Sequence, residues 1–213
     1  MRTALLENID WTLYVIVDAE WLRGRKVGDV VRQLINGGAG VVQYRDKVSD
    51  SYQFYARCKE IHNITKNSGI PLIINDRFDI ALVVGAEGVH LGQKDLPVDE
   101  VRKVIGNKMI IGGSIHDEAE YERMADADYL GIGSIFPTDT KDDVKICGLD
   151  MVRKIRRKTA RPLIGIGGIN KKNAGSVIKA GCDGVAVISS VMGSDNIREA
   201  VREFKNILKL EVK

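Results

Sequence analysis

The segment VQYRDK at 42–47 places polar side chains at every second position. Gln43, Arg45 and Lys47 would share one face of an extended chain, because side chains alternate between the two faces of a strand. Two cations and an amide on one face suit an anion such as a diphosphate, and arginine can bind two oxygens at once. The alternative interpretation is a solvent-exposed charged loop in which Asp46 pairs with the neighbouring cations.

Two aspartates follow the next apolar segments of the chain. Asp76 comes directly after Asn75, and Asp95 ends the segment HLGQKD at 90–95. Two carboxylates at neighbouring strand ends can share Mg²⁺, which takes few carboxylates and completes its octahedron with phosphate oxygens and water. Each aspartate alone could equally be a surface or capping residue. Their placement after consecutive strands favours a Mg²⁺ site.

The second half of the chain carries hydroxyl groups and glycines that suit a second phosphate. The segment FPTDTK at 136–141 holds two threonine hydroxyls and a lysine. Gly167 and Gly168 end a later apolar run, and Ser189 follows the last one. Glycine lets backbone N–H groups approach an anion closely. A metal-bound diphosphate in one half and a monophosphate in the other describe a two-substrate transferase.

Short runs rich in Val and Ile recur along the chain, each followed by a segment with helical spacing of apolar residues. The expected strands span residues 12–17, 40–44, 71–74, 88–91, 109–112, 129–132, 162–166 and 184–188. Helices are expected, for example, at 51–66, 99–105, 118–124 and 171–180. Eight such pairs predict an α/β fold, a single (β/α)₈ TIM barrel over residues 1–213, whose sites lie at the carboxyl ends of the strands. An open doubly wound sheet is the alternative, but no GxGxxG follows the first strand.

Composition limits the partners and the compartment. The 32 Lys and Arg against 29 Asp and Glu give a formal charge of +3, and the scattered basic residues argue against nucleic acid or a membrane as partner. Cys58, Cys147 and Cys182 are far apart and odd in number, so we expect reduced, structural thiols. Without a signal peptide or a membrane-length apolar run, the chain is expected to be cytoplasmic. Barrels of this size often self-associate, which favours a homodimer.

Six segments resemble the thiamine phosphate synthase family and occur in that family's order. They are VQYRDK, INDR, GVHLGQKDLP, GGSIH, FPTDTK and GIGGI. The resemblance covers nearly the whole chain, from LYVIVD at 13–18 to GVAVIS at 184–189. It implies a Mg²⁺-dependent transferase that joins hydroxymethylpyrimidine diphosphate to a thiazole phosphate and releases diphosphate. With a carboxylated thiazole, CO₂ would also be lost.

The resemblance also implies roles for individual residues. Those implied for the pyrimidine diphosphate are Gln43, Tyr44, Arg45, Asp46, Lys47, Asn75, Ser114 and Lys141. Those implied for the thiazole phosphate are Thr138, Asp139, Thr140, Gly168, Ile188 and Ser189. Asp76 and Asp95 would bind Mg²⁺, and the cations of Arg45, Lys47 and Lys141 would stabilise the leaving diphosphate. Tyr44 and Asp46, where the family usually has Leu and Glu, fall on the opposite strand face and bear more on packing than on activity.

The chemistry implied is dissociative and needs no strong base. The aminopyrimidine helps to expel diphosphate, and the thiazole nitrogen captures the resulting cation. His62 is expected on a helix surface, His90 within a strand and His116 at a helix start, with no Ser or Cys partner for nucleophilic catalysis. A related thiazole tautomerase, which carries a catalytic histidine at the position of His116, is one alternative. A non-catalytic sensor of phosphate ligands on a barrel scaffold is another.

Overall fold

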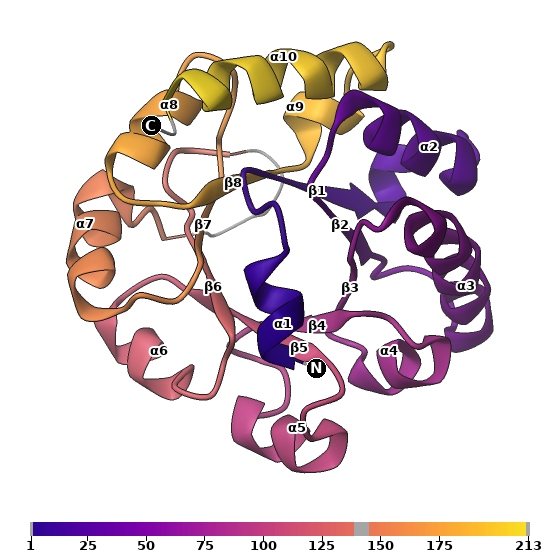
Figure 1. Cartoon of the computed structure of the whole chain (residues 1–213), viewed down its shortest axis with the longest axis horizontal. Coiled ribbons are helices and arrows are strands. Elements are labelled where there is room, and N and C mark those ends of the chain that lie inside the picture. Colours follow the sequence, from indigo (N-terminus) through magenta and orange to yellow (C-terminus); the bar gives the residue numbers. More distant parts are fainter. Residues whose placement is uncertain (1, 139–144, 212–213) are drawn as a thin grey trace.

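Eight parallel strands close into a barrel in a computed structural model that describes residues 2–138 and 145–211 (Figure 1). The strands pair in chain order, and β8 pairs with β1. They are β1 (Leu13–Asp18), β2 (Val41–Arg45), β3 (Leu72–Asn75), β4 (Gly88–Leu91), β5 (Ile110–Ile115), β6 (Tyr129–Ile132), β7 (Leu163–Ile166) and β8 (Gly184–Val187). Each strand overlaps the range expected from the sequence, so the prediction of a (β/α)₈ TIM barrel is confirmed.

Helices follow the strands and form a ring around the barrel (Figure 1). They are the 3₁₀ helix η1 (Ala19–Leu22), α2 (Val27–Gly37), α3 (Ser51–Ser68), α4 (Phe78–Val84), α5 (Val98–Ile105), α6 (Glu118–Arg123), α7 (Gly148–Lys158), α8 (Ala174–Lys179), α9 (Ser189–Met192) and α10 (Ile197–Glu211). One further helix, α1 (Arg2–Glu7), precedes β1. At α3 the boundaries have clear local causes. Asp50 accepts a hydrogen bond from Gln53 N at 2.8 Å, and Gly69, at φ 69°, ends the helix.

The strands are buried on both faces and separate two apolar cores. The larger core lies between the outward strand face and the helices. The second fills the barrel interior and consists of Trp11, Tyr14, Ile16, Val41, Ile73, Ile110, Tyr129, Ile164 and Ala186. Helix α1, which the sequence analysis did not predict, lies across this interior in Figure 1, and Leu5, Leu6 and Ile9 pack against it. The amino ends of the strands are therefore covered.

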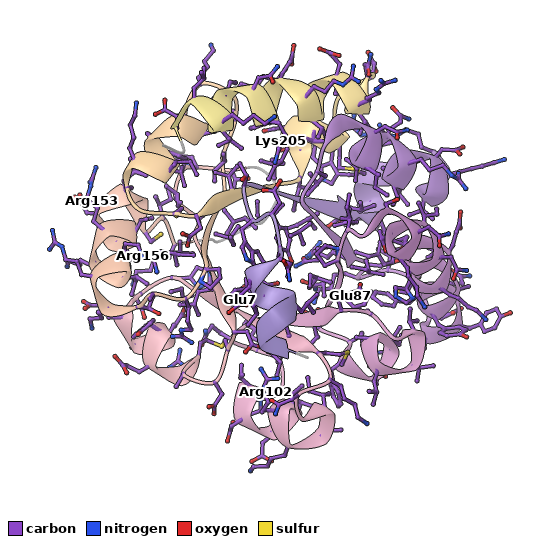
Figure 2. The ribbon with its side chains drawn as sticks, in the orientation of Figure 1. Glu7, Glu87, Arg102, Arg153, Arg156 and Lys205 are labelled. Carbon is purple, nitrogen blue, oxygen red and sulfur yellow. The ribbon has the colours of Figure 1, made fainter. Side chains whose placement is uncertain are left out.

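Acidic side chains at the amino ends of the strands accept hydrogen bonds from backbone N–H groups of the neighbouring strands. The pairs are Glu87 with Leu72, Asp128 with Ile111 and Asp183 with Leu163, at 2.7–2.8 Å. Arg102 and Arg156 bind two of these carboxylates, Asp128 and Asp183, at 2.6 and 2.8 Å (Figure 2). In barrels of this kind, interactions at the amino ends of the strands serve stability, and the carboxyl ends are left for chemistry.

The remaining sequence expectations concern burial. His62, expected on a helix surface, is instead buried, and its Nε2 lies 3.4 Å from Glu87 Oε1, because α3 turns this side chain towards the end of α4. All three cysteines are unpaired thiols, as expected, and burial raises the pKa of Cys182 to about 12. Within the described ranges, no helix has both the length and the apolar character needed to cross a bilayer.

Candidate active site

Two adjoining pockets open at the carboxyl ends of the strands, on the side of the barrel away from α1. The inner pocket, about 500 Å³, lies within the barrel, and the outer one, about 660 Å³, lies over β6, β7 and β8. Residues that line both are Ser114, Gly131, Ile166, Ala186 and Ile188. Because they share these residues, the two pockets form one continuous cavity at the carboxyl ends of the strands.

The inner pocket brings together four residues that the sequence analysis assigned to the diphosphate substrate. They are Gln43, Arg45, Asn75 and Ser114. Arg45 and Asn75 are the last residues of their strands, and Ser114 and Gln43 lie one and two residues before a strand end. Closure of the barrel therefore brings all four to a common space. Arginine and amide groups at this place can bind an anion that enters from the open end.

Asp18 is a site residue that the sequence analysis missed. It ends β1, is only 2% exposed, and accepts hydrogen bonds from Glu20 N at 3.0 Å and from the Arg45 guanidinium. A buried carboxylate on one edge of a guanidinium fixes its orientation and leaves other N–H groups to bind an anion. The signal was present in the segment LYVIVD, where an acidic residue ends an apolar strand at the functional end of the barrel.

Asp76 and Asp95 lie side by side after β3 and β4. Burial raises the pKa of Asp95, and the neighbouring Asp76 carboxyl raises it further, although Gly92 N donates a hydrogen bond to Asp95 Oδ2 at 2.6 Å. Asp76 has a left-handed backbone (φ 61°), and its N–H donates to His90 O at 2.8 Å, which fixes the carboxylate in place.

The chemistry of this pair fits Mg²⁺. Two crowded carboxylates lose their mutual repulsion when a divalent cation lies between them, and Mg²⁺ needs only one or two of them besides phosphate oxygens and water. The Lys47 ammonium binds Asp76, so a cation already pairs with this carboxylate. No group of three or more His, Cys, Asp or Glu residues suited to a metal occurs in the described parts of the chain.

The side chains of Tyr44 and Asp46, which the resemblance assigned to the substrate, turn away from the cavity towards α3. The Tyr44 ring is fully buried against Phe54 of α3, with ring centroids 5.3 Å apart, and its hydroxyl donates to Asp46 Oδ2 at 2.8 Å. Arg57 of α3 also donates to this oxygen, at 2.8 Å. The physical reason is strand alternation, which turns residue 44 away from the face that Gln43 and its neighbours share.

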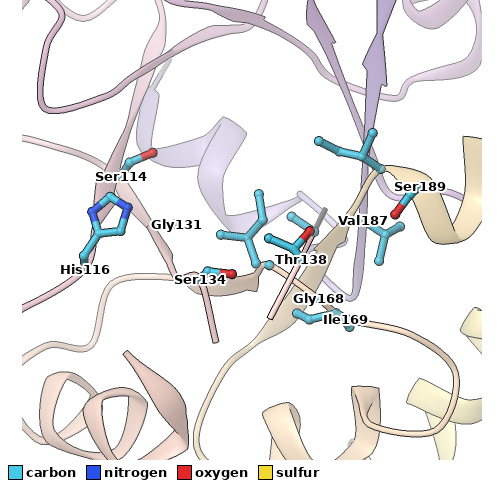
Figure 3. Close-up of a pocket in the computed structure, with 14 residues that line it drawn as sticks. Ser114, His116, Gly131, Ser134, Thr138, Gly168, Ile169, Val187 and Ser189 are labelled. Atoms are coloured by element: carbon cyan, nitrogen blue, oxygen red, sulfur yellow. The ribbon is translucent and has the colours of Figure 1, made fainter. Parts of the chain in front are cut away.

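The outer pocket contains the hydroxyl and glycine residues expected to bind a phosphate. They are Thr138, Gly168, Ile188 and Ser189, together with Ser134 and Gly167 (Figure 3). Gly167 and Gly168 have φ values of 94° and 63°, and a Cβ atom at Gly168 would lie 2.2 Å from Pro137 O. Only glycine fits this turn, which keeps the backbone open to a ligand. The predicted residues Asp139, Thr140 and Lys141 lie outside the described residues.

His116 also lines the outer pocket, across from Ser189 (Figure 3). It follows β5 and precedes the capping residue of α6, as the sequence indicated. Both its backbone N–H and its Nδ1 lie 2.7 Å from Glu120 Oε2. Glu120 therefore fixes the imidazole at the start of α6, and Nε2 is the ring nitrogen left to face the pocket.

Inside the barrel, five polar side chains form a hydrogen-bonded chain that the sequence analysis did not predict. Gln43 Nε2 donates to Tyr14 Oη at 2.7 Å, and Tyr14 Oη lies 2.9 Å from Tyr129 Oη. Tyr129 Oη lies 3.0 Å from His90 Nδ1, and His90 Nε2 lies 2.8 Å from Ser114 Oγ. These contacts join the floor of the inner pocket to Ser114, which lines both pockets.

Comparisons with known proteins identify the family of the chain. The family model for thiamine monophosphate synthase matches residues 13–191. The thiamine-phosphate synthase of Chloroflexus aurantiacus is 45% identical over 203 residues, covering 94% of each chain, and that of Persephonella marina is 42% identical, covering 95% of this chain and 98% of its own.

A solved structure of a thiamine phosphate pyrophosphorylase from Pyrococcus furiosus superposes with a TM-score of 0.87. It shares 36% identity and covers 96% of this chain and 98% of its own. A family model matches most of the chain, and full-length relatives are more than 40% identical to it. The chain belongs to the thiamine monophosphate synthase family.

Proposed function

We propose that this chain joins hydroxymethylpyrimidine diphosphate to a thiazole phosphate, giving thiamine phosphate and diphosphate. The observation that carries the proposal is the continuous cavity with two different ends. The inner end carries Arg45, Asn75 and the nearby carboxylate pair, which suit a metal-bound diphosphate, and the outer end carries hydroxyls and a glycine turn, which suit a monophosphate. In this proposal the barrel acts as one domain of residues 1–213.

The residues divide the work between binding and charge stabilisation. Arg45, held by Asp18, would bind the diphosphate, with Lys47 and, by the family resemblance, Lys141 as further cations. Asp76 and Asp95 would hold Mg²⁺, which when bound neutralises charge on the diphosphate. The apolar walls formed by Ile166, Ala186 and Ile188 would exclude water from the carbocation that forms when diphosphate leaves.

In this proposal the two rings would meet where the inner and outer pockets join. Ser114 and Ile188 line both pockets, so a pyrimidine in the inner pocket and a thiazole in the outer one would meet at these residues. Holding the thiazole nitrogen beside the benzylic-type carbon converts a bimolecular capture into an intramolecular one, which is worth several kcal/mol of the barrier. No protein base is required for this bond to form.

A thiazole tautomerase is the second candidate, and His116 is the observation that favours it. Its imidazole lines the outer pocket and is held by Glu120, as a proton-transfer group would be. The inner pocket argues for the synthase, because a tautomerase does not use the pyrimidine diphosphate and has no need of Arg45 or of a carboxylate pair. A phosphate-ligand sensor likewise has no need of the carboxylate pair.

One experiment separates these candidates. The purified protein is incubated with both substrates and Mg²⁺, and mass spectrometry follows thiamine phosphate. Parallel samples contain the thiazole phosphate alone in D₂O, where NMR would detect tautomerisation as deuterium incorporation. We expect thiamine phosphate only when both substrates are present, and little activity in Arg45→Gln, whereas Arg32→Gln, an exposed arginine of α2, keeps wild-type turnover. Deuterium exchange without coupling would refute the synthase. The absence of both reactions would favour the phosphate-ligand sensor.

A further inference from the structure

The hydrogen-bonded chain inside the barrel carries an inference of its own. Its members come from five strands, with Tyr14 on β1, Gln43 on β2, His90 on β4, Ser114 on β5 and Tyr129 on β6. All five side chains line the inner pocket; Tyr14, Gln43 and Tyr129 are at most 2% exposed, whereas His90 and Ser114 are half-buried. The chain therefore runs along the wall of the cavity, from its most buried side chains to Ser114.

The space for this chain is specifically built. A Cβ atom at Gly112 would lie 2.1 Å from Tyr129 Cζ and 2.4 Å from His90 Nδ1, so a glycine is required for these two side chains to meet. The Trp11 ring packs on the other side of Tyr129, with centroids 4.8 Å apart. Rings enclosed in this way keep their rotamers, and the contact between Tyr129 and His90 is therefore fixed.

Counting hydrogens gives the chain a direction. Gln43 Nε2 donates to Tyr14 Oη, so the single hydrogen of Tyr14 remains for Tyr129, its other polar contact among the described residues. Tyr129 accepts that hydrogen and donates its own to His90 Nδ1. Burial raises the pKa of both tyrosines above the ordinary range, so both hydroxyls keep their hydrogens.

The direction continues through the imidazole. A nitrogen that accepts from Tyr129 carries no hydrogen, so the hydrogen of the His90 imidazole lies on Nε2. Nε2 then donates to Ser114 Oγ, and the hydroxyl hydrogen of Ser114 is left to point into the cavity. Reversing the amide of Gln43 would reverse every donor in the chain, because each of the groups between Gln43 and Ser114 has one hydrogen to give.

We propose that Tyr14, Tyr129 and His90 are positioning residues that hold Ser114 as a hydrogen-bond donor towards the substrate. The substrate group opposite Ser114 must then be an acceptor, such as a ring nitrogen or a phosphate oxygen, and a donor such as an amino group is disfavoured there. This inference rests on the proposed function only for the identity of the substrate. The direction of the chain belongs to the protein alone.

The direction is tested in the free protein by NMR of ¹⁵N-histidine-labelled samples. Two-bond ¹H–¹⁵N correlations identify the protonated nitrogen of each imidazole, and His90→Gln assigns the His90 signals by their loss. We expect a single tautomer, with the proton on Nε2, in the wild type and a mixture of tautomers in Tyr129→Phe. Tyr121→Phe, whose hydroxyl donates to Lys158 O outside the barrel, should leave the signals unchanged. A wild-type proton on Nδ1 would overturn the proposal.

The effect on Ser114 is tested by a double-mutant cycle in the coupling assay. Tyr129→Phe should lower kcat/KM for the pyrimidine diphosphate by roughly threefold to tenfold, as expected for one neutral hydrogen bond, and Tyr14→Phe should do the same. In a Ser114→Ala background, neither change should cost more than about twofold. Equal losses in both backgrounds would show that the tyrosines do not act through Ser114. If the wild type lacks coupling activity, the proposed function fails, and the NMR result still decides the direction of the chain.

Discussion

The substitution Asp46→Asn should destabilise the fold and leave catalysis intact, because the Asp46 carboxylate binds α3 and not the cavity. Its side chain is fully buried (0% exposed) and accepts hydrogen bonds from Ser49 N, Val48 N, Tyr44 Oη and Arg57 Nη1 at 2.8–3.0 Å. The Oδ1 of asparagine can still accept from Ser49 N and Val48 N, but the Nδ2 amino group that replaces Oδ2 cannot accept from Arg57 or from Tyr44. The variant therefore loses the charge-assisted bond and leaves Arg57 without its partner.

The magnitude follows from the pKa of this carboxyl. Burial alone would raise the pKa of Asp46, but the hydrogen bonds from Ser49, Val48 and Tyr44 outweigh burial and lower it from 3.8 to about 2. A shift of this size corresponds to about 2.5 kcal/mol of stability. Because the folded pKa lies below the unfolded one, this stability is fully present above pH ~4 and is lost as the pH falls towards about 2.

Urea denaturation followed by circular dichroism measures the effect. At pH 7 we expect Asp46→Asn to lower the free energy of unfolding by about 2 kcal/mol, and the gap to the wild type to narrow steadily between pH ~4 and ~2.5. The control is Asp29→Asn, which breaks an exposed pair with Arg32 on α2 and should cost less than ~0.5 kcal/mol. A difference in unfolding free energy that stays constant with pH would refute the electrostatic reasoning. A large loss of kcat/KM would indicate that Asp46 contributes to the active site.

Four further outcomes test the site. Asp76→Asn should weaken Mn²⁺ binding, measured by electron paramagnetic resonance, and should lower the rate of thiamine phosphate formation by more than roughly tenfold at limiting metal. Unchanged Mn²⁺ binding would contradict the metal assignment. Thr138→Val and Ser189→Ala should each raise KM for the thiazole phosphate more than KM for the pyrimidine diphosphate. Each lost hydroxyl should cost about 1 kcal/mol of binding free energy. Asp18→Asn should raise KM for the diphosphate substrate by releasing Arg45, and equal effects on both substrates would count against that role. His116→Ala should keep kcat within roughly tenfold, whereas a loss of ~10²–10⁴-fold would indicate proton transfer.

The sequence determined the fold because the relevant signals are local. Short Val- and Ile-rich runs that are apolar on both faces favour strands covered on both sides, and their eightfold alternation with helical segments favoured a closed barrel over an open sheet. Once the barrel is given, the residues that follow each strand must meet at one end. Arg45, Asn75 and Ser114 therefore gathered as predicted.

Alternation along a strand explains where the side chains of Tyr44 and Asp46 lie. The family's segment at 43–47 reads as a single binding unit, but a strand turns successive side chains to opposite faces. Tyr44 and Asp46 therefore face α3, as the alternation indicated. Asp18 could have been found by the same rule, since it ends β1 as Asn75 ends β3.

Only the tertiary structure decided which polar groups pair across the barrel. Tyr14 and Tyr129 are 115 residues apart in sequence, and each by itself reads as an apolar strand residue. Their contact exists because ring closure faces β1 and β6 across a common interior and because Gly112 leaves room for Tyr129 beside His90. Strand periodicity fixes the face on which a side chain lies. The partner that it meets there depends on the registers of all eight strands around the closed barrel, which no local segment encodes.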